Sequence, residues 1–292
     1  MSFRSGIVAL AGRPNVGKST LANALSGRHV AAVSPRPQTT RRRVVAVAGG
    51  DGWQAVLLDL PGFQRPADLL TERMQRSVDA GLADCDAALF VLNANEPTGR
   101  GDQFIAERLR ASRLPVVVVL NQVDLVEPSE IARQIAAAAP LVEMVALHPV
   151  SALTGDGLDA LRTDLAGMLV EGPRYFPAGM ATNQTDQELA SELIREAALQ
   201  RLRQEIPHAL AVDVEEISAA KKGRVIRARI LVETESQKGI VVGKGGTMIA
   251  AIGQAAREQL GRLWGTPVHT DITVKVRPRW RRDDAMLDRL GI

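Results

Sequence analysis

The sequence lacks the residues that would tie the chain together covalently or build a soft metal centre. Its one cysteine, Cys85, cannot form a disulfide within the chain, and the apolar run ADCDAALFVL around it indicates a buried, unreactive thiol. The four histidines, His29, His148, His208 and His269, show no spacing typical of a metal site. We therefore exclude a disulfide scaffold and assign the histidines no chemistry.

Long hydrophobic runs and aromatic residues are also scarce. The longest apolar run, LPVVVVL, is far shorter than the roughly 20 residues that span a bilayer. The N-terminal MSFRSGIVALAG becomes polar too soon for a signal peptide, so we expect a cytoplasmic protein. Aromatic residues make up 3% of the chain, which leaves few side chains to stack on nucleic-acid bases.

The 292 residues are enough for two globular domains, and their charge is unevenly distributed. Residues 1–185 contain 18 Lys/Arg and 18 Asp/Glu, whereas residues 221–282 contain 14 and 4, an excess of 10 positive charges. Such a segment is typical of a surface that binds a polyanion. A solvated face that only confers solubility would have the same composition, so charge alone does not decide between the two.

The first 170 residues alternate between β-branched runs and helical patterns. This alternation predicts an α/β domain with a mainly parallel sheet and helices on both faces. The turn residues GDG between RVVAVAG and WQAVLLDLPG predict a hairpin that adds one antiparallel strand. A four-residue apolar spacing predicts a helix over 68–82. Further buried strands are expected over 6–12, 87–94, 115–124 and 145–152.

A change of pattern after residue 170 predicts a second domain. The stretch EGPRYFPAGMATNQ has two prolines, two glycines and no periodicity, so we interpret residues 171–185 as a linker between domains 1–170 and 186–292. The second domain is expected to be α+β. Its predicted order is helix 186–204, strands 210–218 and 224–233, a glycine loop, helix 246–261 and strand 268–277.

The first glycine loop, GRPNVGKS at 12–19, fits the phosphate-loop pattern G-x-x-x-x-G-K-[ST]. It follows a predicted strand and opens a predicted helix, whose amides and positive end point at a bound anion. Lys18 would reach the β- and γ-phosphates, and Ser19 would ligate Mg²⁺. The predicted phosphate-binding residues are Gly12, Arg13, Pro14, Asn15, Val16, Gly17, Lys18, Ser19 and Thr20.

Two later motifs indicate that the base is guanine. NQVD ends one valine-rich strand and SAL ends the next, at the edge where α/β sheets bind ligands. Asp124 can accept from N1–H and the exocyclic amine of guanine, which adenine does not offer, and the Ala152 amide can donate to O6. Each motif alone would indicate only a turn, but together they predict GTP. The predicted base-binding residues are Asn121, Gln122, Asp124, Ser151, Ala152 and Leu153.

With these motifs in order, the chain resembles the translation-factor-like GTPases. The resemblance implies that Asp59 in DLPG holds Mg²⁺ through water and that the Gly62 amide senses the γ-phosphate. In SPRPQTTRRR it implies that Thr40 ligates Mg²⁺ in the GTP state, with Thr39 as the alternative. Lys18, Thr40, Asp59 and Gly62 would form the catalytic set.

Three positions bear on affinity and rate. Gln122 stands where the family usually has lysine, which predicts a lower affinity without loss of base specificity. Phe63 stands where Ras-type GTPases carry the water-orienting glutamine, which predicts hydrolysis near or below roughly 10⁻⁴–10⁻² s⁻¹. Asn15 resembles the asparagine that helps some relatives bind K⁺; a loop-stabilising asparagine is the alternative.

The second glycine loop, VVGKGG, lacks the phosphate-loop spacing and matches the V-[VI]-G-x-x-G loop of a KH domain. Such a loop clamps about four nucleotides of single strand beside an apolar groove. The element order resembles the type II KH arrangement, and a degenerate KH domain used only for packing is the alternative. Trp264 is expected to anchor the core, whereas Trp280, flanked by arginines, is expected at an RNA-facing edge. The predicted RNA-binding residues are Lys238, Ile240, Val242, Gly243, Lys244, Gly245, Gly246, Ile249, Arg279 and Trp280.

A phosphate-loop GTPase with QTTR before its second strand and one C-terminal type II KH domain resembles the Era family over essentially the whole chain. The resemblance implies binding to the 3′ region of 16S rRNA, assistance in assembling the 30S ribosomal subunit, and a weak peripheral contact with the cytoplasmic membrane. We expect the nucleotide state to control the KH surface through the linker. The competing hypotheses are a GTPase acting on another RNA, such as tRNA, and an RNA chaperone that binds GTP without using it. No coiled coil or apolar stripe suggests more than a monomer.

Overall fold

The structure is a computed structural model that describes residues 2–34, 36, 38–63, 66–202 and 206–292. The chain forms two compact units. The first contains Met1–Ala31, Thr40–Arg65 and Met74–Asn183, and the second contains Ala32–Thr39, Pro66–Arg73 and Gln184–Ile292. Two short segments of the N-terminal half therefore belong to the second unit. The predicted helix at 186–204 runs into residues 203 and 204, which lie outside the described residues.

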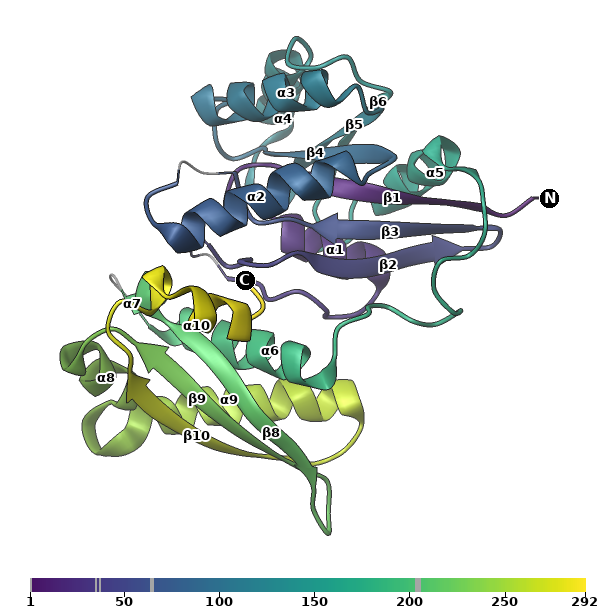
Figure 1. The fold of residues 1–292 in the computed structure, drawn as a ribbon. Helices are drawn as coiled ribbons and strands as arrows, with labels where there is room; N and C mark the ends of the chain where they lie inside the picture. The colour runs from purple at the N-terminus through teal and green to yellow at the C-terminus, as the bar shows by residue number, and fades with distance from the viewer. Residues whose placement is uncertain (1, 35, 37, 64–65, 203–205) are drawn as a thin grey trace. The chain divides into compact units, whose positions relative to one another are not determined.

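The first unit is built on a seven-stranded sheet in the order β2-β3-β1-β4-β5-β6, with β7 paired to β1 (Figure 1). Its strands are β1 (Arg4–Ala11), β2 (Val44–Gly50), β3 (Trp53–Asp59), β4 (Ala87–Asn93), β5 (Val116–Asn121), β6 (Ala146–Pro149) and β7 (Val170–Glu171). β2 runs antiparallel to β3, while β1, β3, β4, β5 and β6 are mutually parallel. The predicted hairpin and the mainly parallel sheet are confirmed.

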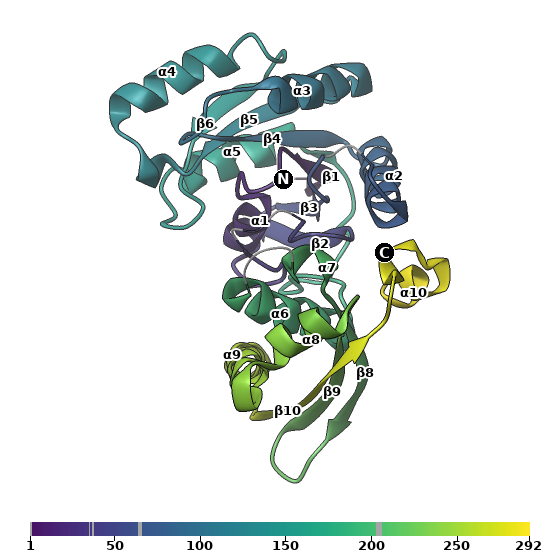
Figure 2. The ribbon, with the colours of Figure 1, turned by 90° about the vertical axis from the view of Figure 1, so that its left-hand side faces the viewer.

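Helices cover both faces of this sheet (Figure 2), and each face has its own apolar core. The helices are α1 (Lys18–Ser26), α2 (Leu69–Ala83), α3 (Arg100–Ser112), α4 (Pro128–Ala138) and α5 (Leu158–Met168). α1 and α5 pack on one face through Leu21 and Leu161, and α3 packs on the other through Ile105. The strands are apolar on both faces because both are buried, as parallel sheets require.

The stretch predicted as a linker is hydrogen bonded to the first unit over most of its length. The backbone N–H and C=O of Phe176 pair with the Gln54 side chain at 2.9 Å each, and the Val47 N–H donates to the Ala181 carbonyl at 2.8 Å. This contact satisfies part of the open edge of β2, which an edge strand otherwise exposes. The first unit accordingly extends to Asn183.

The C-terminal part of the second unit is a three-stranded sheet in the order β10-β9-β8 covered by two long helices. Its strands are β8 (Ala211–Ala219), β9 (Arg224–Val232) and β10 (Val268–Val276), and its helices are α6 (Asp186–Arg201), α7 (Ile206–Ala209), α8 (Glu235–Val242), α9 (Thr247–Trp264) and α10 (Asp284–Arg289). β8 is antiparallel and β10 parallel to β9. A capping box of Thr185 and Glu188 starts α6. The predicted fold class is confirmed, and the short α10 was not predicted.

Candidate functional site

The phosphate loop runs from the end of β1 to the start of α1, and its glycines are pressed against neighbouring strands. A Cβ on Gly12 would lie 2.5 Å from the Val91 carbonyl oxygen, and one on Gly17 would lie 2.1 Å from Asn121 Nδ2. Gly17 also has a φ of 94°, in the region that favours glycine. No larger residue fits at either position, so the loop geometry depends on both glycines.

Lys18 lies folded into this loop. Its side chain is buried, and Nζ donates to the carbonyl oxygens of Gly12 at 3.0 Å and Arg13 at 2.9 Å. Burial lowers the pKa of Lys18 to about 8, and the nearby Asp59 charge opposes that shift. The loop therefore holds an ammonium group among its own carbonyls, beside the amides that start α1.

Three oxygen-bearing side chains converge next to Lys18. Ser19 Oγ donates to Asp59 Oδ2 at 2.6 Å and lies 2.9 Å from Thr40 Oγ1, while Thr40 Oγ1 donates to the same Asp59 oxygen at 3.2 Å. Asp59 is fully buried. Mg²⁺ prefers oxygen ligands of this kind, so these residues fit a magnesium ion. Thr39 instead donates to the Arg36 carbonyl at 2.6 Å, so the structure brings Thr40 and not Thr39 to this set.

Asn121 joins the phosphate loop to the predicted base loop. Its side-chain Nδ2 donates to the Val16 carbonyl at 2.9 Å, and its Oδ1 accepts from the Ala152 amide at 3.0 Å. Ser151 is buried and its Oγ accepts from the Thr154 amide, which fixes the turn that carries Ala152. The NQVD and SAL motifs therefore meet, as the parallel strands predicted.

Two of the predicted base-binding residues are exposed to solvent. Asp124 is exposed in the short 3₁₀ helix η1 (Val123–Leu125), and Leu153 is 79% exposed. Gln122 has a φ of 67° and its Nε2 donates to the Asn15 carbonyl at 3.1 Å, so it contacts the phosphate loop. An exposed acceptor and an exposed apolar side chain suit a flat base with hydrogen-bond donors.

Gly62 lies against the phosphate loop, whereas the side chain of its neighbour Phe63 packs on α3. A Cβ on Gly62 would lie 2.9 Å from Pro14 Cγ, so the Gly62 backbone lies directly against the loop. Phe63 is buried and packs edge-on against Phe104 of α3, with ring centroids 6.4 Å apart. Its ring belongs to the α3 core and offers no polar group to a water molecule.

Arg13 has a partner that the sequence did not indicate. Its Nε donates to Asp102 Oδ1 at 2.8 Å, and its Nη1 lies 3.1 Å from Glu96 Oε2. Asp102 is fully buried and also accepts from the Gly99 amide at the start of α3. The Arg13 guanidinium is therefore bound to α3, and Arg13 offers its backbone to the loop. The only signal in the sequence was the Gly99–Asp102 spacing typical of a helix start.

The second glycine loop lies between α8 and α9 and is open to solvent. Gly243, Gly245 and Gly246 have φ values of 75°, 62° and 81°, which few other residues adopt, and Lys244 is exposed. A Cβ on Gly245 or Gly246 would meet nothing within 4 Å. The loop is therefore not buried in a core, and a polymer backbone can approach it.

The apolar residues beside this loop are partly accessible. Ile240 is 45% exposed, and Val242 and Ile249 are half-buried at the edge of the core. Lys238 lies 3.6 Å from Glu235, in an exposed ion pair on the same helix. Together with the loop, these side chains line the surface predicted to bind RNA.

The prediction that Trp280 faces RNA is wrong. Trp280 is fully buried, and its indole N–H donates to the Ala209 carbonyl at 2.8 Å. The chain turns at Arg279, with a φ of 57°, into a 3₁₀ helix, η3 (Trp280–Arg282), that places the ring in the core and leaves Arg279 exposed. Trp264 is half-buried, packs at the edge of the core and carries Arg224 over its ring at 4.6 Å.

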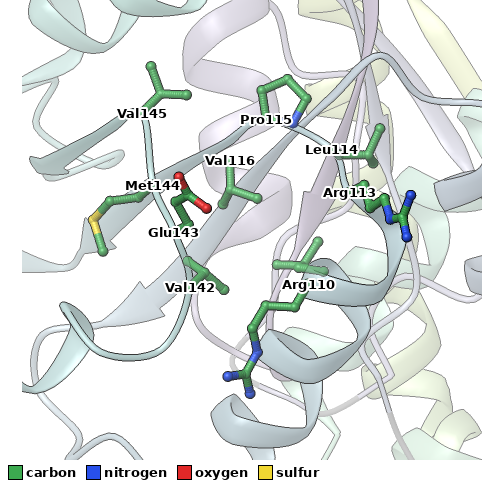
Figure 3. Close-up of a pocket in the computed structure, with 10 residues that line it drawn as sticks. Arg110, Arg113, Leu114, Pro115, Val116, Val142, Glu143, Met144 and Val145 are labelled. Carbon is green, nitrogen blue, oxygen red and sulfur yellow. The ribbon is translucent and has the colours of Figure 1, made fainter.

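A separate hollow lies at the other end of β5 from Asn121 (Figure 3). Arg110, Arg113, Glu143 and Val145 line it, and its volume is about 660 Å³. Its two arginines and one glutamate come from the end of α3 and the segment before β6. The nucleotide motifs do not reach it, so it is not the predicted site.

Fold and geometry together define the class of this protein as a phosphate-loop GTPase joined to a KH domain. A family model described as a 50S ribosome-binding GTPase matches residues 7–122, and a KH-domain model matches residues 205–281. GTPase Era of Mycobacterium tuberculosis (strain H37Ra) is 44% identical over 99% of both chains. GTPase Era of Mycobacterium sp. (strain KMS) is 43% identical over the same share. The chain belongs to the Era family of GTPases, which confirms the predicted resemblance.

Solved structures of the same family have this fold over nearly the whole chain. An Era variant of Aquifex aeolicus bound to GDP and AlF₄⁻ has a TM-score of 0.95 at 34% identity, covering 99% of each chain. An Era structure in complex with MgGDPNP and nucleotides 1506–1542 of 16S ribosomal RNA has a TM-score of 0.93 at 35% identity, with the same coverage.

Proposed function

We propose that this GTPase is a magnesium-dependent switch that binds 16S rRNA through its KH domain and assists small-subunit (30S) biogenesis. The observation that carries the proposal is the convergence of Ser19, Thr40 and Asp59 beside Lys18, in a chain that also exposes a GxxG loop. A related Era binds both a GTP analogue with magnesium and a fragment of 16S rRNA. No two-site arrangement of this kind is needed for an enzyme that only hydrolyses GTP.

Each site residue has a role in this proposal. Ser19 and Thr40 would hold Mg²⁺ directly and Asp59 through water; the ion would neutralise charge on the β- and γ-phosphates. Lys18 and the amides of the loop bind the same oxygens. The Gly62 backbone, which lies against Pro14, would donate its amide to the γ-phosphate.

The proposal predicts slow hydrolysis without assistance. Phe63 is buried against Phe104, so the position that orients water in Ras-type enzymes supplies no polar group. The unassisted rate should lie near or below roughly 10⁻⁴–10⁻² s⁻¹. We further propose K⁺ beside Asn15, whose backbone is in the left-handed region with a φ of 66°. Equal turnover in potassium and sodium buffers would refute the K⁺ site and leave the rest intact.

The RNA surface is proposed to be the GxxG loop with the apolar residues around Ile240. Lys244 is exposed and free to contact phosphate, and the excess of positive charge over 221–282 attracts a polyanion. The weak contact with the cytoplasmic membrane is proposed from the family alone. Among the described residues, no helix is long and apolar enough to cross a bilayer.

The deciding experiment identifies the RNA that crosslinks to the GTP-loaded protein in cells. Recovery of the 3′ region of 16S rRNA would support the proposal, and enrichment of tRNA would favour the other-RNA hypothesis. Lys18→Ala separates the switch from a chaperone that ignores GTP: the switch requires that 30S maturation fail in this variant. Normal maturation with Lys18→Ala would refute the switch.

A further inference from the structure

Helix α6 buries charged residues as well as its apolar face. Glu192, Arg195 and Glu196 are only 5%, 4% and 4% exposed. Their spacing of three and four residues places them on one face of the helix, apart from the residues such as Leu193 that enter the apolar core. Charged side chains are almost never buried unless they are paired, so this face requires specific partners.

Glu196 accepts from Gln200 at 3.0 Å and from Gln259 at 3.4 Å. The partners of Arg195 are Glu192 and the segment Ala32–Thr39, which belongs to the same compact unit as α6. Arg195 Nη1 donates to the Gln38 carbonyl at 3.4 Å, and Nη2 donates to the Thr39 carbonyl. Nη2 also donates to Glu192 Oε2 at 2.7 Å, which balances the charge. Five residues further along α6, Gln200 donates to the Val33 carbonyl at 3.4 Å. A buried guanidinium therefore binds two consecutive backbone carbonyls, which suits the fork of arginine and not the single ammonium of lysine.

The residue that follows these carbonyls is Thr40, the hydroxyl of which lies 2.9 Å from Ser19 Oγ. Consecutive Cα atoms are about 3.8 Å apart, so fixing the carbonyls of Gln38 and Thr39 restricts where the Thr40 side chain can be. Gln38 has a φ of 62°, a conformation that needs support from its surroundings. We propose that Arg195 is a positioning residue that holds Thr40 where it can ligate the magnesium of bound GTP.

This inference rests on the proposed function, since it assigns Thr40 to the GTP state. In that state the γ-phosphate and Mg²⁺ order the loop, and after hydrolysis the loop is released. Arg195 therefore raises the affinity for Mg²⁺·GTP and contributes nothing to GDP binding. Because thermodynamic coupling is reciprocal, any interaction that holds the Arg195 side chain in this position on α6 also raises the affinity for GTP. Arg195 thus acts on Thr40 only through the backbone of Gln38 and Thr39, which lie in the same compact unit as α6.

The test compares nucleotide affinities of full-length variants, using fluorescent GDPNP and GDP over a range of Mg²⁺ concentrations. Arg195→Ala removes the fork, and Arg195→Lys keeps the charge with a single donor. The double variant Glu192→Gln/Arg195→Met removes both buried charges at similar volume, so it tests the inference even if Arg195→Ala alone fails to fold. Arg201→Ala is the matched control, because Arg201 on the same helix donates to the Ala197 carbonyl within its own helix.

We expect Arg195→Ala and the double variant to weaken GDPNP binding about tenfold, with GDP affinity within about twofold of wild type. In these two variants the Mg²⁺ concentration for half-maximal turnover should rise. The GDPNP affinity of Arg195→Lys should fall between those of wild type and Arg195→Ala, and that of Arg201→Ala should match wild type. An unchanged ratio of GDPNP to GDP affinity in both variants would overturn the inference, whatever their stability. If wild type itself showed no magnesium-dependent preference for GDPNP, the proposed function would fail and the inference with it.

Discussion

Asn121 offers the sharpest test of how the nucleotide site is held together. It is 2% exposed, and its side chain makes one hydrogen bond to Val16 in the phosphate loop and one to Ala152 in the base loop. Asn121→Ala removes both bonds and leaves a buried carbonyl and a buried amide without these partners. Each such loss costs about 1–3 kcal/mol, so the two together cost at least about 2 kcal/mol.

We expect this free energy to be lost from the native arrangement of the two loops. Both loops are proposed to contact parts that GTP and GDP share, so we expect the Kd for each nucleotide to rise by about 30-fold or more, which is the equivalent of about 2 kcal/mol. The ratio of the two affinities should stay unchanged. Thermal unfolding of the first unit should also begin at a lower temperature, because the loops are less ordered in the Asn121→Ala variant.

The assay is a titration of fluorescent GTP and GDP analogues, with Gln122→Ala as the neighbouring control. Gln122 makes one exposed hydrogen bond, to the Asn15 carbonyl at 3.1 Å, so its loss should change affinity by no more than a few-fold. Asn121→Ala protein with a Kd within twofold of wild type and an unchanged Tm would show that the two hydrogen bonds of Asn121 do not organise the site.

Three further outcomes are expected. Asp124→Asn should weaken GTP binding about tenfold or more and gain binding of xanthosine triphosphate, measured by competition, because the amide can donate where the carboxylate accepted. Gly245→Asp should abolish RNA binding and spare GTP hydrolysis, whereas Gly179→Asp, also at a positive φ in open space, should leave RNA binding unchanged. Lys244→Ala should make the slope of log RNA affinity against log salt concentration less negative by about 0.7. Burial raises the pKa of Cys85 to about 12, so native protein should resist iodoacetamide at pH 8 and react fully in guanidinium; rapid native labelling would contradict the assignment.

The features that could be predicted from the sequence depend on residues close together in the chain. The phosphate loop is a local pattern between a strand and a helix, and the β2–β3 hairpin follows from the GDG turn. The meeting of NQVD with SAL required one more rule, that parallel strands present their carboxyl ends at one edge. The rule put both motifs at the same edge, and the structure adds a hydrogen bond between Asn121 and Ala152, 31 residues apart, that was not predicted.

The features that were missed depend on partners that leave no local signal. Trp280 lies among arginines, which suggested exposure, but its indole docks on Ala209, 71 residues earlier. Asp102 binds Arg13 across 89 residues, and Arg195 binds Thr39 across 156. In each case the sequence shows an ordinary polar or aromatic residue, and only the fold provides the partner that buries it. The hydrogen bonds of Phe176 to Gln54 of β3 and of Ala181 to Val47 of β2 were missed for the same reason.

The two glycine loops show how similar residues serve different ligands. Both contain residues with positive φ values, and both carry a lysine. In the first loop Lys18 is 6% exposed and lies beside the oxygens of Ser19, Thr40 and Asp59, the last two of them buried, an arrangement that fits a compact anion together with a metal ion. In the second loop Lys244 is exposed and no acidic side chain pairs with it among the ion pairs of the described residues, an open arrangement that suits one phosphate after another along a strand. The difference in burial, more than the glycine pattern, separates a nucleotide site from a polymer site.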